Sequence, residues 1–167
     1  MDFRNDILPL KDRLYRLALR ITLNPQEAED IVQDTLIKVW NRRESWDEIQ
    51  SIEAFSLTIC RNIALDHMKL RENQNASLDG MVIERPDHAM SPLEQAAQND
   101  SVERVRRIMN ALPEKQRSCM QLRDFEGKSY KDIAEILSLT EEQVKINIFR
   151  ARKSVKETFE REEHFGV

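Results

Sequence analysis

Hydrophobic residues in the first half of the chain recur at helical spacing in three stretches. In each stretch the apolar side chains lie three or four positions apart, which is typical of an amphipathic helix packed on a core. They are Leu14, Leu17, Ala18 and Ile21; then Ala28, Ile31, Val32, Thr35, Leu36 and Val39; then Ile52, Phe55, Ile59 and Ile63. The pattern therefore predicts three helices before residue 74.

Two of these helices have recognisable start signals. Asn24 is a good N-cap, Pro25 suits the first helical turn, and Glu27 is expected to complete a capping box. Ser51 is expected to cap the third helix. Between the second and third helices, the polar residues 40–50 interrupt the apolar pattern. We expect a loop there.

Helical periodicity is lost between Gln74 and Pro92, where Asn, Ser, Asp, Gly and Pro cluster. The Arg85-Pro86-Asp87 segment is incompatible with a helix interior. About twenty residues without a pattern is long for a loop inside one compact domain. The sequence therefore predicts a flexible linker over 74–95 that joins two small helical domains, 1–73 and 96–167.

The second half returns to helical spacing. One apolar stripe ends before Pro113, and a further helix is predicted from Glu114 to about Phe125, ending at Gly127. The members of the first stripe are Val102, Val105, Ile108, Met109 and Leu112. With the two helices that follow, the second domain is expected to contain four.

The strongest local signal is a helix-turn-helix between Ser129 and Lys156. The segments 129–132 and 140–143 each read as a capping box, and the three residues 138–140 separate a short helix from a longer one. This layout is typical of proteins that place the second helix in the DNA major groove.

Composition supports an all-α fold and argues against membrane insertion or secretion. The chain is 40% hydrophobic and 34% charged, with only 3 Gly and 5 Pro. No apolar run approaches the roughly 20 residues needed to span a bilayer, and the first residues have no apolar core typical of a signal peptide. A cytoplasmic location is expected.

The formal net charge is −4, but DNA binding depends on where the basic residues lie. The outward face of the last helix gathers side chains able to contact phosphates or base edges. They are Gln143, Lys145, Asn147, Arg150 and Lys153. An ordinary solvated helix face is the alternative, and the capped helix before it favours DNA binding.

The sequence contains no arrangement of residues typical of a catalytic or metal-binding site. Cys60 and Cys119 lie far apart and are expected to be buried free thiols, and the histidines are scattered. Asp66 and His67 are the candidate acid–base pair, but neighbours on a helix point about 100° apart. The sequence predicts no enzyme, no cofactor, no metal site and no small-molecule substrate.

Several segments resemble the sigma-70 family, specifically its extracytoplasmic-function (ECF) group. Residues 28–40 resemble the polymerase-binding helix of sigma domain 2, and residues 59–67 its promoter-reading helix. Residues 112–117, 125–134 and 149–152 are similar to sigma domain 4. The resemblance implies binding to the β′ clamp helices and β flap of core RNA polymerase. It also implies recognition of −10 and −35 promoter DNA, and an anti-sigma factor, commonly membrane-anchored, as a further partner.

The resemblance assigns one helix face to polymerase. Asp30, Gln33, Asp34 and Ile37 share this face, and acidic groups around an apolar centre suit a basic partner surface. Acidic residues that merely complement the helix dipole are the alternative. That alternative explains the first turn but not Asp34.

The resemblance also assigns DNA contacts. In the first domain, Arg61, Asn62 and Lys69 are candidates for −10 DNA, and Trp46 is either a base contact or a core anchor. For the −35 element the family pattern indicates Gln143, Ile146, Phe149 and Arg150 for bases and Lys145 and Arg152 for the backbone. Many relatives have Ser-Arg where this chain has Ile146-Asn147, so its −35 preference is expected to differ. Relatives also usually have Gly where this chain has Ser138 in the turn, and a positive φ on a non-Gly residue there costs roughly 1 kcal/mol.

A two-domain regulator that binds an operator through its helix-turn-helix is the rival interpretation. The helix that ends at Trp40 distinguishes the two, because a sigma factor must bind polymerase through it. We also considered how an acidic chain avoids DNA when alone. The hypothesis is that its domains pack together and mask Arg150.

Overall fold

The computed structural model describes residues 2–77 and 101–164, and every regular element in these ranges is helical. The all-α prediction is confirmed. The first group comprises η1 (Phe3–Ile7), η2 (Leu8–Leu10), α1 (Lys11–Thr22), α2 (Pro25–Asn41), η3 (Arg43–Glu48) and α3 (Ile52–Ser77). The second comprises α5 (Ser101–Asn110), α6 (Glu114–Met120), η4 (Gln121–Phe125), α7 (Tyr130–Leu137) and α8 (Glu141–His164). Within the described ranges, no helix has the length and apolarity to cross a membrane.

The predicted helix starts are present, with one correction. The Asn24 side chain accepts from the backbone N–H groups of Gln26 (3.0 Å) and Glu27 (3.1 Å), and the Ser51 hydroxyl accepts from the N–H of Ala54 (3.2 Å). The capping box predicted for Glu27 was wrong, because its carboxylate pairs with Arg71 of α3. This ion pair ties the first turn of α2 to α3.

Helix α3 is longer than the sequence predicted. It continues to Ser77, so residues 74–77, which were assigned to the linker, are helical. The first Gly or Pro after this helix is Gly80, and nothing in residues 72–77 breaks a helix. The rest of the predicted linker, and the start of the predicted second domain, lie outside the described residues as far as residue 100.

The helix-turn-helix has its predicted form. At the start of α8, the Thr140 N–H donates to the Gln143 side chain (2.9 Å) and the Gln143 N–H donates to the Thr140 hydroxyl (3.1 Å). Ser129 caps α7 by accepting from the Asp132 N–H (3.1 Å). Ser138 ends α7 in the left-handed region with φ 54°. The capping box at 140–143 is therefore confirmed, whereas at 129–132 the structure gives the Ser129 cap without the reciprocal bond from Asp132.

The strain at Ser138 gives a stability prediction. Replacing Ser138 by Gly should raise the stability by about 1 kcal/mol, since Gly adopts this backbone conformation without a Cβ clash. Ser138 is exposed, so the substitution removes little packing. Thermal unfolding followed by circular dichroism measures the change. A lower melting temperature would contradict it.

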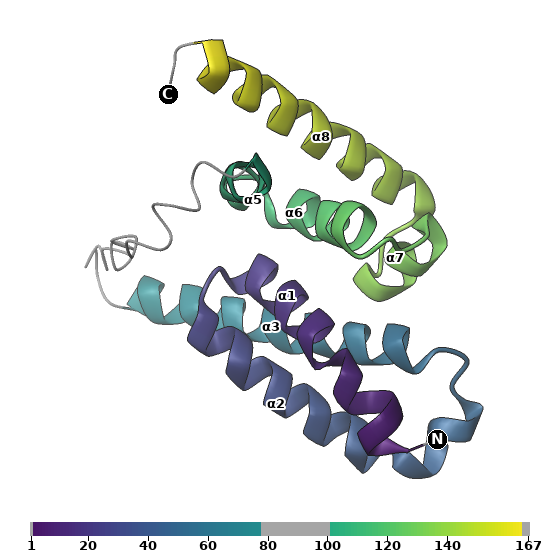
Figure 1. Cartoon of the computed structure of the whole chain (residues 1–167). Helices are drawn as coiled ribbons and strands as arrows, with labels where there is room; N and C mark the ends of the chain where they lie inside the picture. Colours follow the sequence, from purple (N-terminus) through teal and green to yellow (C-terminus); the bar gives the residue numbers. More distant parts are fainter. Residues whose placement is uncertain (1, 78–100, 165–167) are drawn as a thin grey trace.

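The two helix groups pack against each other (Figure 1). We call α1–α3 the N-terminal group and α5–α8 the C-terminal group. Contacts between them run from α1 to α6 and η4 and from α3 to α7. One buried cluster contains Leu14, Leu17 and Leu57 of the first group together with Leu122 and Ile133 of the second. The groups therefore share a hydrophobic core.

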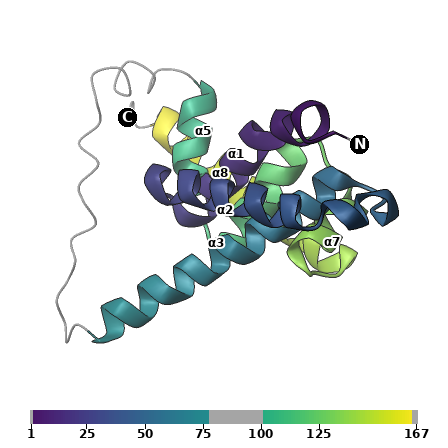
Figure 2. The same ribbon diagram turned by 90° about the horizontal axis from the view of Figure 1, so that it is seen from below.

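The hypothesis that the two domains pack together is confirmed, but the hypothesis that this packing masks Arg150 is wrong. The groups do pack together, but Arg150 is exposed on α8 and is not masked. The second half of α3 extends beyond the other helices (Figure 2). Leu70, Glu72 and Asn73 on that half are exposed. The closed packing therefore covers one side of the N-terminal group and leaves other faces open.

Candidate nucleic-acid and protein interfaces

The outer face of α8 presents the predicted −35 residues together. Seven of the eight are exposed and Asn147 is half-buried. The exposed set is Gln143, Lys145, Ile146, Phe149, Arg150, Arg152 and Lys153. Phe149 is 68% exposed and Ile146, three positions earlier on the helix, is 47% exposed, so the two present apolar surface together. The inward face holds the helix on the core through Val144, Ile148, Ala151 and Val155.

Two polar side chains on this face already have intramolecular partners. The Gln143 side-chain oxygen accepts the Thr140 N–H, so its NH₂ group faces outward as a donor. The Asn147 side-chain NH₂ donates to the Gln143 carbonyl one turn earlier (2.8 Å), which leaves its oxygen as an acceptor. These hydrogen bonds limit what each amide can offer a base.

A groove of about 440 Å³ lies beside this face. Its lining is basic and aromatic: Tyr130, Lys145, Ile148, Phe149, Arg152, Lys153 and Lys156. The sequence reasoning missed Tyr130 and Lys156. Lys156 follows Lys153 and Arg152 at i+3 and i+4, so helical spacing would have found it. Tyr130 comes from α7 and is brought here by tertiary packing.

Cations surround the Tyr130 ring. The Arg123 guanidinium lies 4.5 Å and the Lys145 ammonium 5.6 Å from the ring centroid. Arg152 forms two hydrogen bonds with Asp124, and this bonding raises the pKa of Arg152 above its usual value. The groove is thus a cationic surface whose side chains are oriented by neighbours.

The predicted polymerase face of α2 is open. Asp30, Gln33 and Asp34 are exposed, and Ile37 is 57% exposed. Across the described part of the chain, neither carboxylate of this face forms an ion pair within 4.0 Å. Trp40 extends the apolar centre by one turn and is exposed as well. Two carboxylates one turn apart, followed on the same face by an exposed apolar side chain, are therefore available to a partner.

Trp46 is a core anchor, which corrects its assignment to −10 DNA. The side chain is 5% exposed and clusters with Ile7 and Val39. Its indole N–H donates to the Val39 carbonyl at the end of α2 (2.9 Å). The exposed aromatic of this region is Trp40, which stacks edge-on with Phe3 and has the Arg43 guanidinium 4.5 Å from its ring centroid.

The two tryptophans should respond differently to substitution. Trp46→Phe should lower stability by about 1–3 kcal/mol, because it removes the buried indole hydrogen bond to the Val39 carbonyl and leaves part of the Trp46 volume unfilled. The Val39 carbonyl then keeps only the Arg42 N–H (3.1 Å). Trp40→Phe should leave stability nearly unchanged. Urea denaturation of both variants tests the difference. Equal losses would contradict the anchoring role of Trp46.

The other −10 candidates are divided between two environments. Asn62 and Lys69 are exposed on α3. Arg61 is half-buried, and its Nε has no hydrogen-bond partner. It lies close enough to Cys119 of α6 to offset part of the rise in the pKa of that thiol that burial and Glu114 cause. Closed packing therefore brings Arg61 to the C-terminal group and leaves the other two open.

Both cysteines are buried free thiols, as predicted. Burial raises the pKa of Cys60 to about 12 and that of Cys119 to about 12. Cys60 donates to the Leu14 carbonyl at 3.4 Å inside the N-terminal group. In contrast, Cys119 lies where the two groups meet.

Comparison with known proteins agrees with this division of surfaces. Sigma-70 region 2 matches residues 7–74, and Sigma-70, region 4 matches residues 102–155. The RNA polymerase sigma-H factor of Pseudomonas aeruginosa is 29% identical over 160 residues, which cover 90% of this chain and 83% of that protein. The ECF RNA polymerase sigma factor EcfG of Rhodopseudomonas palustris is 27% identical, with 91% and 82% covered.

A solved structure is similar over both groups. The sigma factor RpoE from Bartonella quintana, in complex with the anti-sigma factor NepR, has a TM-score of 0.78 and 28% identity. The similarity covers 95% of this chain and 97% of that chain. This chain therefore belongs to the sigma-70 family of RNA polymerase sigma factors, in its ECF group.

Proposed function

We propose that this chain directs core RNA polymerase to promoters through two separate surfaces. The α2 face with Asp30, Gln33, Asp34 and Ile37 binds the β′ clamp helices. The α8 face binds the −35 element. The observation that carries the proposal is that both faces are exposed on one chain. One has two carboxylates beside an apolar side chain, and the other is basic. An operator-binding regulator needs the second face but has no use for the first.

The N-terminal group corresponds in this proposal to sigma domain 2 and the C-terminal group to sigma domain 4, which also binds the β flap. A subunit that binds polymerase and promoter DNA with these two domains acts in the cytoplasm, where the bacterial chromosome lies. The subunit itself performs no catalysis and needs no cofactor. An anti-sigma factor, possibly membrane-anchored, is a further proposed partner, because the similar RpoE structure contains one.

At the −35 element, Arg150 and the outward NH₂ group of Gln143 donate to base acceptors, and Ile146 contacts a thymine methyl. Phe149 adds an apolar contact next to them. Lys145, Arg152 and Lys153 bind phosphates, together with the neighbouring Lys156 and Tyr130 of the groove. Asn147 contributes its side-chain oxygen, which accepts from a base amino group.

At the −10 element, Asn62 reads a base edge and Lys69 holds the backbone. Arg61 joins them when the C-terminal group no longer lies beside it. Trp40 in the last turn of α2 and Arg43 at the start of η3 provide an exposed stacked pair; these two helical elements occupy most of the segment 40–50, which the sequence had predicted as a loop. An unstacked base finds a stacking surface there. This assigns to Trp40 the aromatic role that the sequence had offered to Trp46.

Run-off transcription tests the proposal. Purified chain is added to core RNA polymerase with a library of promoter fragments, and the transcripts are sequenced. Template-specific transcripts that require the chain are expected. If the chain binds DNA fragments but never associates with core polymerase, the operator-binding alternative replaces the proposal.

A further inference from the structure

We propose that the hydrogen bonds at the start of α8 determine which bases of the −35 element this chain selects. They fix Gln143 as a hydrogen-bond donor only and Asn147 as an acceptor only. At the base that Gln143 contacts, the chain therefore selects guanine or thymine, and at the base that Asn147 contacts it selects adenine or cytosine. The inference rests on the proposed function and adds a positioning residue to it, Thr140, which acts on DNA only through Gln143.

The helix cap forces one orientation on the Gln143 amide. The Gln143 side chain accepts the backbone N–H of Thr140 at 2.9 Å. An N–H group can only donate, so the atom that faces it is the amide oxygen and not the NH₂ group. The reciprocal bond, from the Gln143 N–H to the Thr140 hydroxyl (3.1 Å), completes the capping box. Only the NH₂ group of the exposed Gln143 side chain is left for a base.

The Asn147 amide is fixed in the opposite sense. Its NH₂ group donates to the Gln143 carbonyl oxygen at 2.8 Å. Because a carbonyl can only accept, this contact needs the NH₂ group and leaves the side-chain oxygen of Asn147 for a base. The two amides are four positions apart and so lie on one helix face, one turn from each other. The face thus presents a donor followed by an acceptor.

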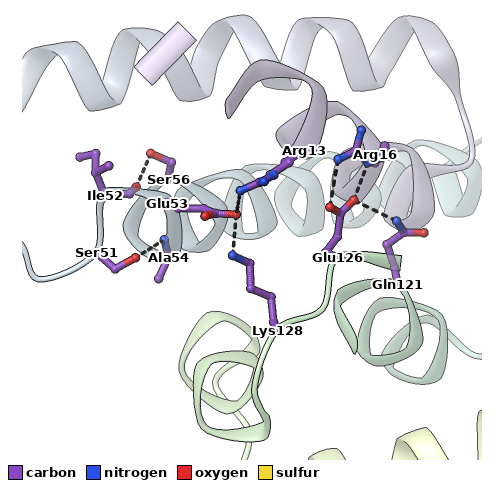
Figure 3. Close-up of polar contacts among 10 residues, drawn as sticks. All are labelled: Arg13, Arg16, Ser51, Ile52, Glu53, Ala54, Ser56, Gln121, Glu126 and Lys128. Atoms are coloured by element: carbon purple, nitrogen blue, oxygen red, sulfur yellow. Dashed lines mark hydrogen bonds and ion pairs between the residues drawn. The ribbon is translucent and has the colours of Figure 1, made fainter. Parts of the chain in front are cut away.

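These hydrogen bonds are local to the start of α8. Other polar contacts of the C-terminal group join separate elements, as Lys128 between η4 and α7 does by pairing with Glu53 of α3 at 2.6 Å (Figure 3). In contrast, the bonds that orient the two amides join positions at most four apart. They do not depend on how the two helix groups are arranged. The same amide orientations therefore persist in the polymerase-bound chain.

The major-groove edges of the bases convert these orientations into a preference. Guanine and thymine present acceptors, cytosine presents an amino donor, and adenine presents one of each. A glutamine with both halves of its amide free reads adenine through two hydrogen bonds. Gln143 would have to release the Thr140 N–H to do so, and loss of a cap destabilises the helix. Gln143 is thus complementary to guanine or thymine, and Asn147 to a base with an amino group.

The surroundings of the two amides make a wrong base costly. In helix-turn-helix proteins, the N-terminal residues of the second helix contact base edges, and the match to Sigma-70, region 4 includes both positions. Ile146 lies between them in the sequence and is 47% exposed. Its apolar side chain displaces water when the face meets DNA. A donor that meets a donor there is left without a partner, which is unfavourable.

Selection from a promoter library tests the inference. Holoenzyme assembled from the full chain and core polymerase selects fragments with a randomised −35 region, and the bound fragments are sequenced. The test variant combines Glu142→Gln with Gln143→Glu, which keeps the net charge. The introduced glutamate accepts the Thr140 N–H as glutamine does, but its second oxygen accepts from the cytosine amino group. One position should change from guanine or thymine to cytosine, by roughly 5- to 150-fold in relative affinity.

Three further variants separate base selection from support of the helix. Glu142→Gln alone keeps the cap and the amide, so its base preferences should match those of the wild type. Gln143→Ala lacks both and should lose the preference at the one position. Exchange of the Thr140 amide hydrogen, followed by NMR on the full chain, should be slower in the wild type and the double variant than in Gln143→Ala. Asn147→Ala should lose a preference for adenine or cytosine at a neighbouring position.

Two outcomes would overturn the inference. One is a wild-type preference for adenine or cytosine at the position that the double variant changes. The other is a double variant whose preferences equal those of the wild type, which would mean that residue 143 selects no base. Failure of the proposed function is distinct, because the chain would then bring core polymerase to no fragment. Selection of the same library by the chain alone still measures the base preference in that case.

Discussion

Replacing Arg150 by Ala should weaken use of the −35 element by roughly 5- to 150-fold, the equivalent of about 1–3 kcal/mol for a lost base contact. Arg150 is exposed on the outer face of α8, near the middle of the predicted DNA-binding set. Affinity of the holoenzyme for a promoter fragment, measured with and without an intact −35 sequence, gives the effect. Core binding should not change.

Arg161→Ala provides the control for this variant. Arg161 is exposed on the same helix but lies three turns beyond Arg150. Both substitutions remove one positive charge, so a difference between them reports position and not net charge. If promoter affinity fell equally in both variants, the effect of Arg150→Ala would be due to the loss of one positive charge and not to a base contact.

Replacing Asp34 by Arg should lower affinity for core RNA polymerase about 30-fold or more, because reversing a charge in a complementary interface costs at least about 2 kcal/mol. Asp34 is exposed beside Ile37 in the α2 face. Fluorescence anisotropy of labelled chain, titrated with core enzyme, measures the affinity.

Glu72→Arg is the matched variant for Asp34→Arg. Glu72 is exposed on the projecting half of α3, and the change in net charge is the same. Its affinity for core enzyme should remain near that of the wild type. If Glu72→Arg weakens binding as much as Asp34→Arg, long-range charge and not the α2 face governs association.

Local signals in the sequence predicted local structure well. The caps at Asn24, Ser51 and Thr140 lie where hydrogen-bonding side chains precede apolar stripes, and each is present in the structure. These features depend on residues within one turn of each other, so the chain reveals them without knowledge of the tertiary fold.

Features that depend on tertiary contacts were not predictable in this way. Glu27 had the right spacing for a capping box, but Arg71, 44 positions later, binds its carboxylate instead. The sequence was equally compatible with Trp46 as a base contact and as a core anchor. The hydrogen bond from its indole to the Val39 carbonyl identifies it as an anchor. The groove residue Tyr130 comes from a different helix. Periodicity contains no information about such partners.

The core shared by the two helix groups has a consequence for chimeric proteins. Leu57 on one side and Ile133 on the other belong to a single buried cluster, so grafting a foreign recognition module onto residues 2–77 creates a mismatched join. Large apolar faces left poorly covered favour aggregation. Engineers who wish to redirect this factor to new promoters would do better to exchange side chains on the outer face of α8 than to transplant whole modules.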